Sequence, residues 1–279
     1  GSILKHVMIL AMVFCVTPAA ILMLIFAPEI LSLMGADETV INVGLNYFRI
    51  VTIGFIFQSL SFTVTAALRG IGETKIPMKN NIIANSCNVL GNAILIYGMF
   101  GFPALGVTGA AISTALSNLI AMVLNVRYIL SGKSVLKLDF KEKFEFSVDV
   151  MRDLVRIGIP TALEQMALRF GVIMFLKIVS GLGNNVYAAH QIALNVLSLS
   201  YSPAQAFGIT ASSLMGRSLG AKDKKLAERY TKMCQRIGLT LAIMMSVSIY
   251  FGASLLAGLY TDNGEIIQNT VIALSIFAF

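Results

Sequence analysis

Long apolar stretches, almost free of charged residues, follow one another along this chain and constrain its fold more than any local motif does. A bilayer's hydrocarbon core is about 30 Å thick, and a helix needs about 20 residues to cross it. Seven stretches reach or approach that length, and an eighth begins where the sequence stops. They are Val7–Phe26, Ile50–Leu68, Ile82–Phe100, Ala104–Val126, Ile157–Val179, Val186–Leu214, Ile237–Tyr260 and Ile266–Phe279. We therefore predict an all-α polytopic membrane protein.

The composition narrows the possible function classes. The chain is 57% hydrophobic and 13% charged, whereas soluble domains carry about 25% charged residues. Its net charge of +7 is not arranged as a basic face interleaved with aromatic residues, so we expect no nucleic-acid partner. The cysteines lie singly in apolar stretches, and the sequence has no metal-ligand spacing, P-loop or nucleophile elbow. We therefore expect that the protein is not an enzyme and that it has neither a metal site nor a cofactor.

The basic residues predict the orientation in the membrane. Of the 21 Lys and Arg residues, 18 precede the first stretch or lie in the loops after the second, fourth and sixth stretches. In the intervening loops the one basic residue is Arg49, and these loops also contain the acidic residues Asp37, Glu38, Asp262 and Glu265. Because cytoplasmic loops are enriched in Lys and Arg, this alternation places the start of the chain in the cytoplasm.

One long charged linker, residues 131–156, divides the chain. We expect residues 1–130 to form four spans of a first helical bundle. Residues 157–279 then form three spans and the start of a fourth in a second, related bundle, as in transporters built from repeats. Within the linker, apolar residues recur at intervals of four, four, three and four: Phe140, Phe144, Val148, Met151 and Val155. This spacing predicts an amphipathic helix at the membrane surface, with a frayed, solvated loop as the alternative.

Amide side chains recur along one face of the third stretch. Asn81, Asn85, Asn88 and Asn92 are spaced by four, three and four residues, which aligns them on one side of a helix. One interpretation is hydrogen bonding between neighbouring helices, because amides commonly join membrane helices. The other is that they form the polar wall of a central pathway.

The fifth stretch contains a carboxylate, Glu164, next to Gln165. Placing a carboxylate in a membrane costs at least a few kcal/mol, and such residues usually mark ion or proton paths. A structural pair with Arg169 is the alternative, but residues five apart on a helix do not face each other. We favour a functional role for Glu164.

The sixth stretch combines polar residues with helix-bending residues. His190 is interpreted as a packing residue, whereas Gln191 and Asn195 are candidates for lining a cavity. Pro203 and Gly208 would let this helix bend, and we predict a hinge there.

Several longer motifs then resemble one family. They read "AALRGIGETKIPM" (66–78), "GIPTALEQM", "AAHQIALNVLSLS" and "SSLMGRSLGAKDKKLAERY". In combination and order they are similar to motifs of the multidrug and toxic compound extrusion (MATE) transporters. The resemblance implies twelve helices in two six-helix bundles around a V-shaped cavity. The stretches here would be helices 3 to 10, so we expect this chain to be part of a longer protein.

The resemblance also assigns roles to residues. The family's helix 5 Asn, followed four residues later by Asp or Asn, contributes to a cation site and matches Asn88 and Asn92. Its helix 7 Glu matches Glu164, which implies cation coupling in the second bundle. Together with the polar residues noted above, we expect the cavity to be lined by Asn85, Asn88, Asn92, Gln165, Gln191 and Asn195.

The function implied is that of a monomeric antiporter in the bacterial inner (plasma) membrane. It would export organic cations or drug-like small molecules in exchange for Na⁺ or H⁺. A flippase for lipid-linked oligosaccharides is the alternative within the same superfamily. A non-transporting scaffold or receptor is a third possibility, but it would have no reason to keep Glu164.

Overall fold

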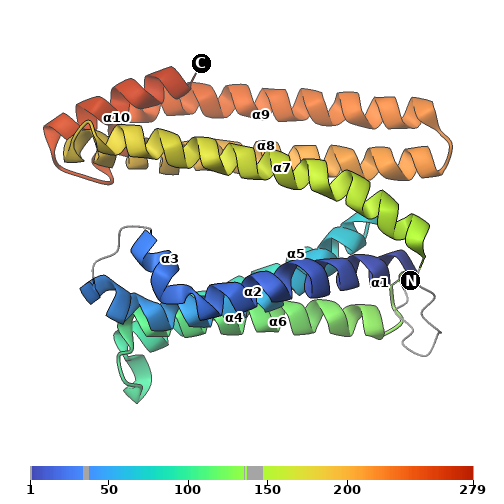
Figure 1. The fold of residues 1–279 in the computed structure, drawn as a ribbon. Coiled ribbons are helices and arrows are strands. Elements are labelled where there is room, and N and C mark those ends of the chain that lie inside the picture. The colour runs from blue at the N-terminus through green and yellow to red at the C-terminus, as the bar shows by residue number, and fades with distance from the viewer. Residues whose placement is uncertain (1, 34–37, 135, 137–146, 279) are drawn as a thin grey trace. The chain divides into compact units, whose positions relative to one another are not determined.

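The structure is a computed structural model that describes residues 2–33, 38–134, 136 and 147–278 (Figure 1). Within these ranges the regular secondary structure is entirely helical. The predicted all-α polytopic fold is therefore confirmed. The chain divides into two compact units, Gly1–Val155 and Arg156–Phe279, and each is described by itself.

The first unit begins with three helical segments that follow one another without a break: α1 (Ser2–Ile9), the π-helix η1 (Leu10–Val16) and α2 (Thr17–Ile25). The wider π turns end next to Pro18, whose ring removes one backbone donor from the ladder. The unit continues with α3 (Ala27–Leu33), α4 (Glu38–Gly70), α5 (Lys75–Tyr97), the 3₁₀ turn η2 (Met99–Gly101) and α6 (Gly106–Leu130).

Helix α6 packs against both α4 and α5 in the first unit (Figure 1). It does so through a face of mostly small residues, which lets helix backbones approach closely in a membrane. The buried residues of this face are Gly109, Ala111, Ser113, Ser117, Ala121, Asn125 and Ile129. At Gly54 of α4, an added Cβ would lie 2.9 Å from the Cα of Ala115, so the α4–α6 contact requires glycine there. An apolar cluster of Leu4, Val64, Leu68 and Ile129 joins α1, α4 and α6.

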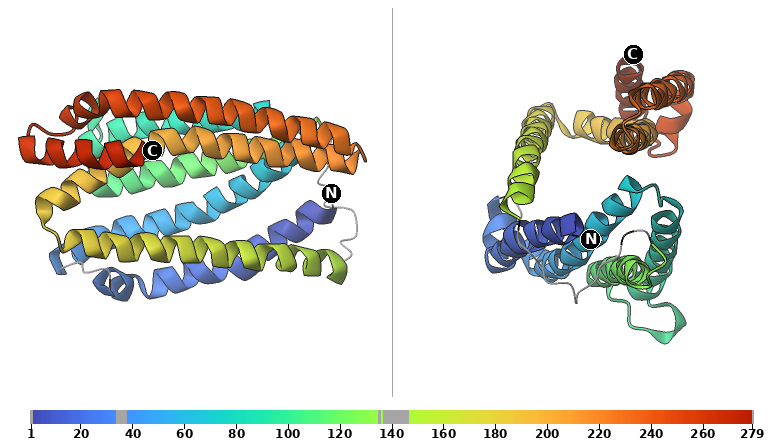
Figure 2. Two further views of the ribbon diagram at one scale, coloured as in Figure 1. Left: turned by 90° about the horizontal axis from the view of Figure 1, so that it is seen from above. Right: turned by 90° about the vertical axis from the view of Figure 1, so that its right-hand side faces the viewer.

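The second unit contains most of α7 (Val148–Ser180), followed by α8 (Asn184–Gly220), α9 (Lys224–Gly258) and α10 (Gly264–Phe277). Helices α8, α9 and α10 pack on one another (Figure 2). Their shared core consists of Ala193, Val196, Ile249, Ala253 and Leu274. Two side-chain caps start helices here: Asp223 accepts from the Leu226 N–H at 2.9 Å, and Asn263 accepts from the Glu265 N–H at 3.0 Å.

Four of the described helical segments are both long and apolar enough to cross a membrane: Ile3–Ile25, Ile41–Gly70, Gly106–Leu130 and Lys224–Gly258. Helices α5, α7 and α8 have 23, 33 and 37 residues, so they are also long enough. They carry the polar residues that the sequence singles out. Helix α10 is a shorter apolar helix.

The predicted amphipathic helix falls partly outside the described residues, because Phe140 and Phe144 lie there. Val148, Met151 and Val155 belong to the first turns of α7. In the described part, these residues therefore continue into the span 157–179 as one helix. The domain boundaries drawn from the sequence at 130 and 157 stay predictions.

Candidate functional site

The amide stripe of α5 separates into two groups. Asn88 lies at the contact with α6, where its Nδ2 donates to Ser113 Oγ and Thr114 Oγ1, both at 3.4 Å. Ser113 Oγ in turn donates to the Asn88 carbonyl at 2.9 Å. Asn92 Nδ2 donates to Asn88 Oδ1 at 3.2 Å. Asn88 thus makes hydrogen bonds between helices, as one of the two sequence interpretations expects, whereas the Asn92 bond stays within α5.

Asn92 also has an open acceptor. Its Oδ1 atom is buried and has no hydrogen-bond partner among the residues that the structure describes. A buried polar atom left in this state costs about 1–3 kcal/mol. A cation or a hydrogen-bond donor that reached Asn92 Oδ1 would remove this cost. The position is therefore chemically suited to binding, in addition to packing.

Asn81 and Asn85 face a different environment, a polar pocket of about 290 Å³ in the first unit. Helices α4, α5 and α6 all contribute to its wall. The lining residues are Gln58, Ser61, Phe62, Thr65, Arg69, Asn81, Ala84, Asn85, Ser117, Asn118 and Ala121. Arg69 is the one charged residue in this set, and its guanidinium carbon lies 5.8 Å from the centre of the Phe62 ring. We call this cavity the α4–α6 pocket.

A buried network of side-chain hydrogen bonds, which the sequence did not predict, supports the α4–α6 pocket. Asn125 of α6 donates from Nδ2 to Ser61 Oγ at 2.9 Å and to Thr65 Oγ1 at 3.2 Å. Asn80 donates to the Asn125 Oδ1 at 2.8 Å. The signal available in the sequence was an amide near the end of an otherwise apolar stretch. It did not reveal a partner 45 positions away.

Glu164 and Gln165 lie on an open face of α7. Every residue from 156 to 175 is exposed. Gln165 lines a shallow groove of about 680 Å³ formed by α7 alone, whose wall also includes Arg169. Among the described residues, no ion pair joins Glu164 to Arg169, and no hydrogen bond joins Glu164 to another predicted site residue. Within the second unit, the structure therefore does not join Glu164 by a hydrogen bond to Gln165, Gln191 or Asn195.

The candidate residues His190, Gln191 and Asn195 lie on α8 close to its buried residues Ala193 and Val196. Gln191 Nε2 donates to the Tyr187 hydroxyl at 3.0 Å. Asn195 is exposed, whereas Ala193 and Val196 are buried. The His190 ring lies 5.2 Å from that of Phe175 in α7 and 6.5 Å from that of Phe277 in α10. These ring contacts agree with a packing role for His190.

The predicted hinge lies inside an unbroken helix. Helix α8 continues past Pro203 to Gly220. An added Cβ at Gly208 would meet no atom within 4 Å, so packing does not require glycine at this position. A role for Pro203 and Gly208 in bending stays a prediction.

Together, the long apolar helices and the polar residues placed on them define a polytopic α-helical membrane protein with polar groups inside its spans. The comparison with known families is more specific. The family model MatE matches residues 3–94 and 160–279. The chain belongs to the MatE family, and the resemblance stated from its motifs is confirmed.

Curated relatives support the same assignment. The chain is 32% identical to "Probable multidrug resistance protein YoeA" of Bacillus subtilis, over 71% of this chain and 43% of that protein. It is 31% identical to "Probable multidrug resistance protein NorM" of Photorhabdus laumondii, over 99% of this chain and 61% of the relative. The chain thus spans roughly half the length of the curated relatives it matches.

Solved structures share the fold at lower identity. A crystal structure of MATE in the straight conformation matches with a TM-score of 0.87 and 21% identity, over 98% of this chain and 60% of that one. The bent form of the Vibrio cholerae MATE transporter VcmN matches with a TM-score of 0.81 and 20% identity, over 98% and 61% of the two chains. At this identity the likeness establishes the fold alone.

Proposed function

We propose that the full-length protein is a secondary active antiporter that exports organic cations or drug-like compounds in exchange for Na⁺ or H⁺. The observation that carries this proposal is the family match over residues 3–94 and 160–279. Relatives described as probable multidrug resistance proteins add to it. The polar groups of both units are consistent with such a transporter, because polar side chains within spans are costly unless they face protein or a water-filled pathway.

In the first unit, the α4–α6 pocket and the open acceptor of Asn92 would supply the polar surface of the pathway. Asn85 lines the pocket, and the Asn92 Oδ1 has no partner among the described residues. An amide oxygen is a ligand suited to Na⁺ and to donor groups of a substrate. We assign Asn85, Asn88 and Asn92 to this polar surface.

In the second unit, Glu164 would couple the ion to transport, and Gln165, Gln191 and Asn195 would line the cavity. Glu164 is exposed in this chain, and an exposed carboxylate within a bilayer must face water or polar groups, because lipid cannot solvate it. Binding of H⁺ or Na⁺ there would shift the balance between outward- and inward-open states, provided that the ion binds one state more tightly. Pro203 and Gly208 would absorb part of the bending.

We further propose that the protein lies in the bacterial inner membrane as a monomer with the start of the chain in the cytoplasm. The alternation of 18 of the 21 Lys and Arg residues supports this orientation. The flippase alternative is not favoured, because a cavity that meets a pyrophosphate would need several cations. The α4–α6 pocket contains one, Arg69, among its lining residues.

The proposal is tested by transport in proteoliposomes. Vesicles containing the full-length protein are loaded with a fluorescent organic cation, and a Na⁺ or pH gradient is imposed. We expect efflux that follows the gradient and stops when an ionophore collapses it. Ion-coupled antiport would be refuted if neither gradient changed the efflux rate, or if an ionophore that collapses the gradient left the efflux rate unchanged.

A further inference from the structure

The first turns of α9 carry four basic side chains on one face. Lys225, Arg229, Lys232 and Arg236 are spaced by four, three and four residues, which aligns them along the helix. All four are exposed. With Glu228 and Met233 they line a surface groove of about 400 Å³. We call these four residues the α9 basic stripe.

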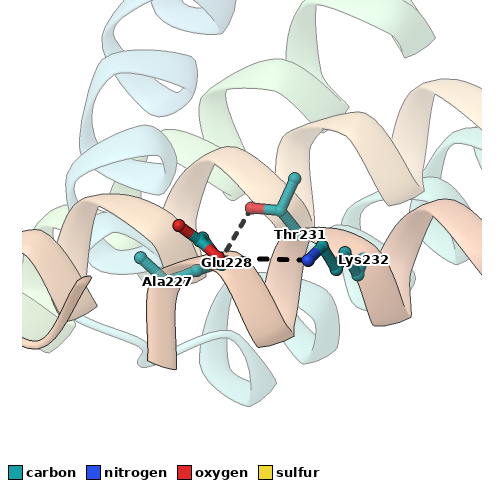
Figure 3. A network of polar contacts seen from close by, with 4 residues as sticks. All are labelled: Ala227, Glu228, Thr231 and Lys232. Carbon is teal, nitrogen blue, oxygen red and sulfur yellow. Dashed lines mark hydrogen bonds and ion pairs between the residues drawn. The ribbon is translucent and has the colours of Figure 1, made fainter. Parts of the chain in front are cut away.

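The opposite face of the same turns packs against α8, so the stripe is turned away from the core of its unit. Ala227 and Cys234 are buried. Thr231 Oγ1 donates to the Ala227 carbonyl at 2.9 Å (Figure 3). The same hydroxyl lies 3.7 Å from the sulfur of Met215 in α8. The packed face fixes the rotation of α9 and thereby presents the stripe on the surface.

The stripe ends where the membrane-spanning part of α9 begins. Residues 237–258 contain no charged side chain and cover about 33 Å at 1.5 Å per residue, which is close to the thickness of the hydrocarbon core. Arg236 therefore lies at the hydrocarbon boundary, and Arg229 lies about 10 Å further along the helix axis. Phospholipid phosphates lie in this interval. Long Lys and Arg side chains reach toward them while their stems cover apolar surface.

One acidic residue competes within the groove. Glu228 Oε2 lies 3.9 Å from Lys232 Nζ, and the two side chains are 73% and 70% exposed (Figure 3). Ion pairs this open to water are weak and are easily exchanged for another anion. Glu228 therefore reduces the positive potential of the stripe without occupying it.

We propose that the α9 basic stripe binds the phosphate of an anionic phospholipid headgroup. Arg229 and Arg236 supply forked donors that match phosphate oxygens, and Lys225 and Lys232 add positive charge on either side. Met233 also lines the groove and gives an apolar contact for the glycerol region. The partner is a lipid because the stripe adjoins the charge-free segment of the same helix. This site is independent of the transport proposal and does not depend on which side of the membrane it faces.

The test measures lipid retained by the purified full-length protein, using native mass spectrometry with dioleoylphosphatidylglycerol or dioleoylphosphatidylcholine. We expect wild type to retain phosphatidylglycerol preferentially. The variant K225Q/R229Q/R236Q should bind it about a hundredfold more weakly, since each basic residue that faces the lipid phosphate contributes about a factor of five. The control K75Q/K79Q/K133Q removes the same charge at exposed positions of the first unit and should match wild type.

A gain-of-binding variant makes the test independent of misfolding. Glu228→Gln removes the competing carboxylate and should raise the affinity for phosphatidylglycerol a few-fold. If the triple variant does not fold, the single variants Arg229→Gln and Arg236→Gln replace it. Equal lipid loss in the stripe variant and the control would overturn the proposal. So would equal retention of both lipids by wild type, or no gain in Glu228→Gln.

Two further experiments test whether a ligand other than a lipid binds the α9 basic stripe. Inorganic phosphate, added without lipid, should not raise the thermal unfolding midpoint as phosphatidylglycerol does. An equal rise would identify a free phosphate as the ligand and overturn the lipid proposal. Purification of a stoichiometric acidic protein that wild type retains and the stripe variant loses, with lipid binding unchanged, would overturn it as well.

Discussion

The side-chain amide of Asn80 in α5 donates to the Oδ1 of Asn125 in α6 at 2.8 Å, in a place where the two residues are only 8% and 0% exposed. The Nδ2 of Asn125 in turn donates hydrogen bonds to Ser61 Oγ and Thr65 Oγ1 of α4. One buried side chain therefore joins the three helices that form the α4–α6 pocket. Its hydrogen bonds fix the side chains of Ser61 and Thr65, which line the pocket, although Asn125 itself does not line it.

We predict that Asn125→Leu destabilises the protein by about 1–3 kcal/mol, because the substitution leaves Asn80, Ser61 and Thr65 without their partner. Unfolding in detergent by a denaturant titration would measure the loss. The control is Asn42→Leu, at an exposed position of α4, which we expect to change stability by about 0.5 kcal/mol or less. A loss in Asn125→Leu no larger than in this control would show that the network contributes no stability.

A second prediction concerns the open acceptor of Asn92. Asn92→Leu should reduce export severalfold at wild-type expression, because it removes the buried oxygen that has no partner among the described residues. Asn92→Asp should increase the dependence of export on Na⁺, since a carboxylate attracts the cation more strongly than an amide does. Both are measured as efflux against external Na⁺ concentration. Unchanged efflux in both variants would leave Asn92 with a packing role alone.

The topology gives a third prediction. Single cysteines at Lys75, Lys133 and Lys224, in a background from which Cys15, Cys87 and Cys234 have been removed, should resist impermeant thiol reagents in intact cells. A cysteine at Asp262 should react under the same conditions. The basis is the alternation of Lys and Arg between loops. Labelling of any of the first three from outside would reverse the proposed orientation.

The sequence predicts the helices well because long apolar runs have few other structures available in a bilayer. It predicts their ends less well. Helix α4 begins at Glu38, well before the run that starts at Ile50. The additional turns contain Asn42 and Arg49, so hydrophobicity alone does not detect them. Hydrophobicity likewise underestimates α9, whose basic first turns precede the apolar run by several turns.

The candidate site is only partly predictable for a different reason. Helical spacing places Asn81, Asn85, Asn88 and Asn92 on one face, but it does not say what each one meets. In the structure Asn88 and Asn92 contact α6 residues or each other, whereas Asn81 and Asn85 line a pocket. The pairing of Asn80 with Asn125 depends on tertiary contact between distant residues, which neither spacing nor composition encodes.

We propose that Glu164 couples ion binding to export. Glu164→Gln keeps the size of the side chain and removes its charge, so H⁺ can no longer bind and leave at this position and Na⁺ loses the attraction of a carboxylate. Glu164→Asp keeps the charge with a shorter reach. Glu38→Gln removes an exposed carboxylate elsewhere and serves as the matched control.

The most direct measurement is efflux of a fluorescent cation from proteoliposomes containing each of these full-length variants at equal protein density, with a Na⁺ or pH gradient imposed. We predict that Glu164→Gln loses gradient-driven efflux by tenfold or more while its thermal unfolding midpoint stays that of wild type. Glu164→Asp should retain part of the rate, and Glu38→Gln should retain all of it. Gradient-driven efflux by Glu164→Gln at the wild-type rate would contradict the account and place coupling on another residue.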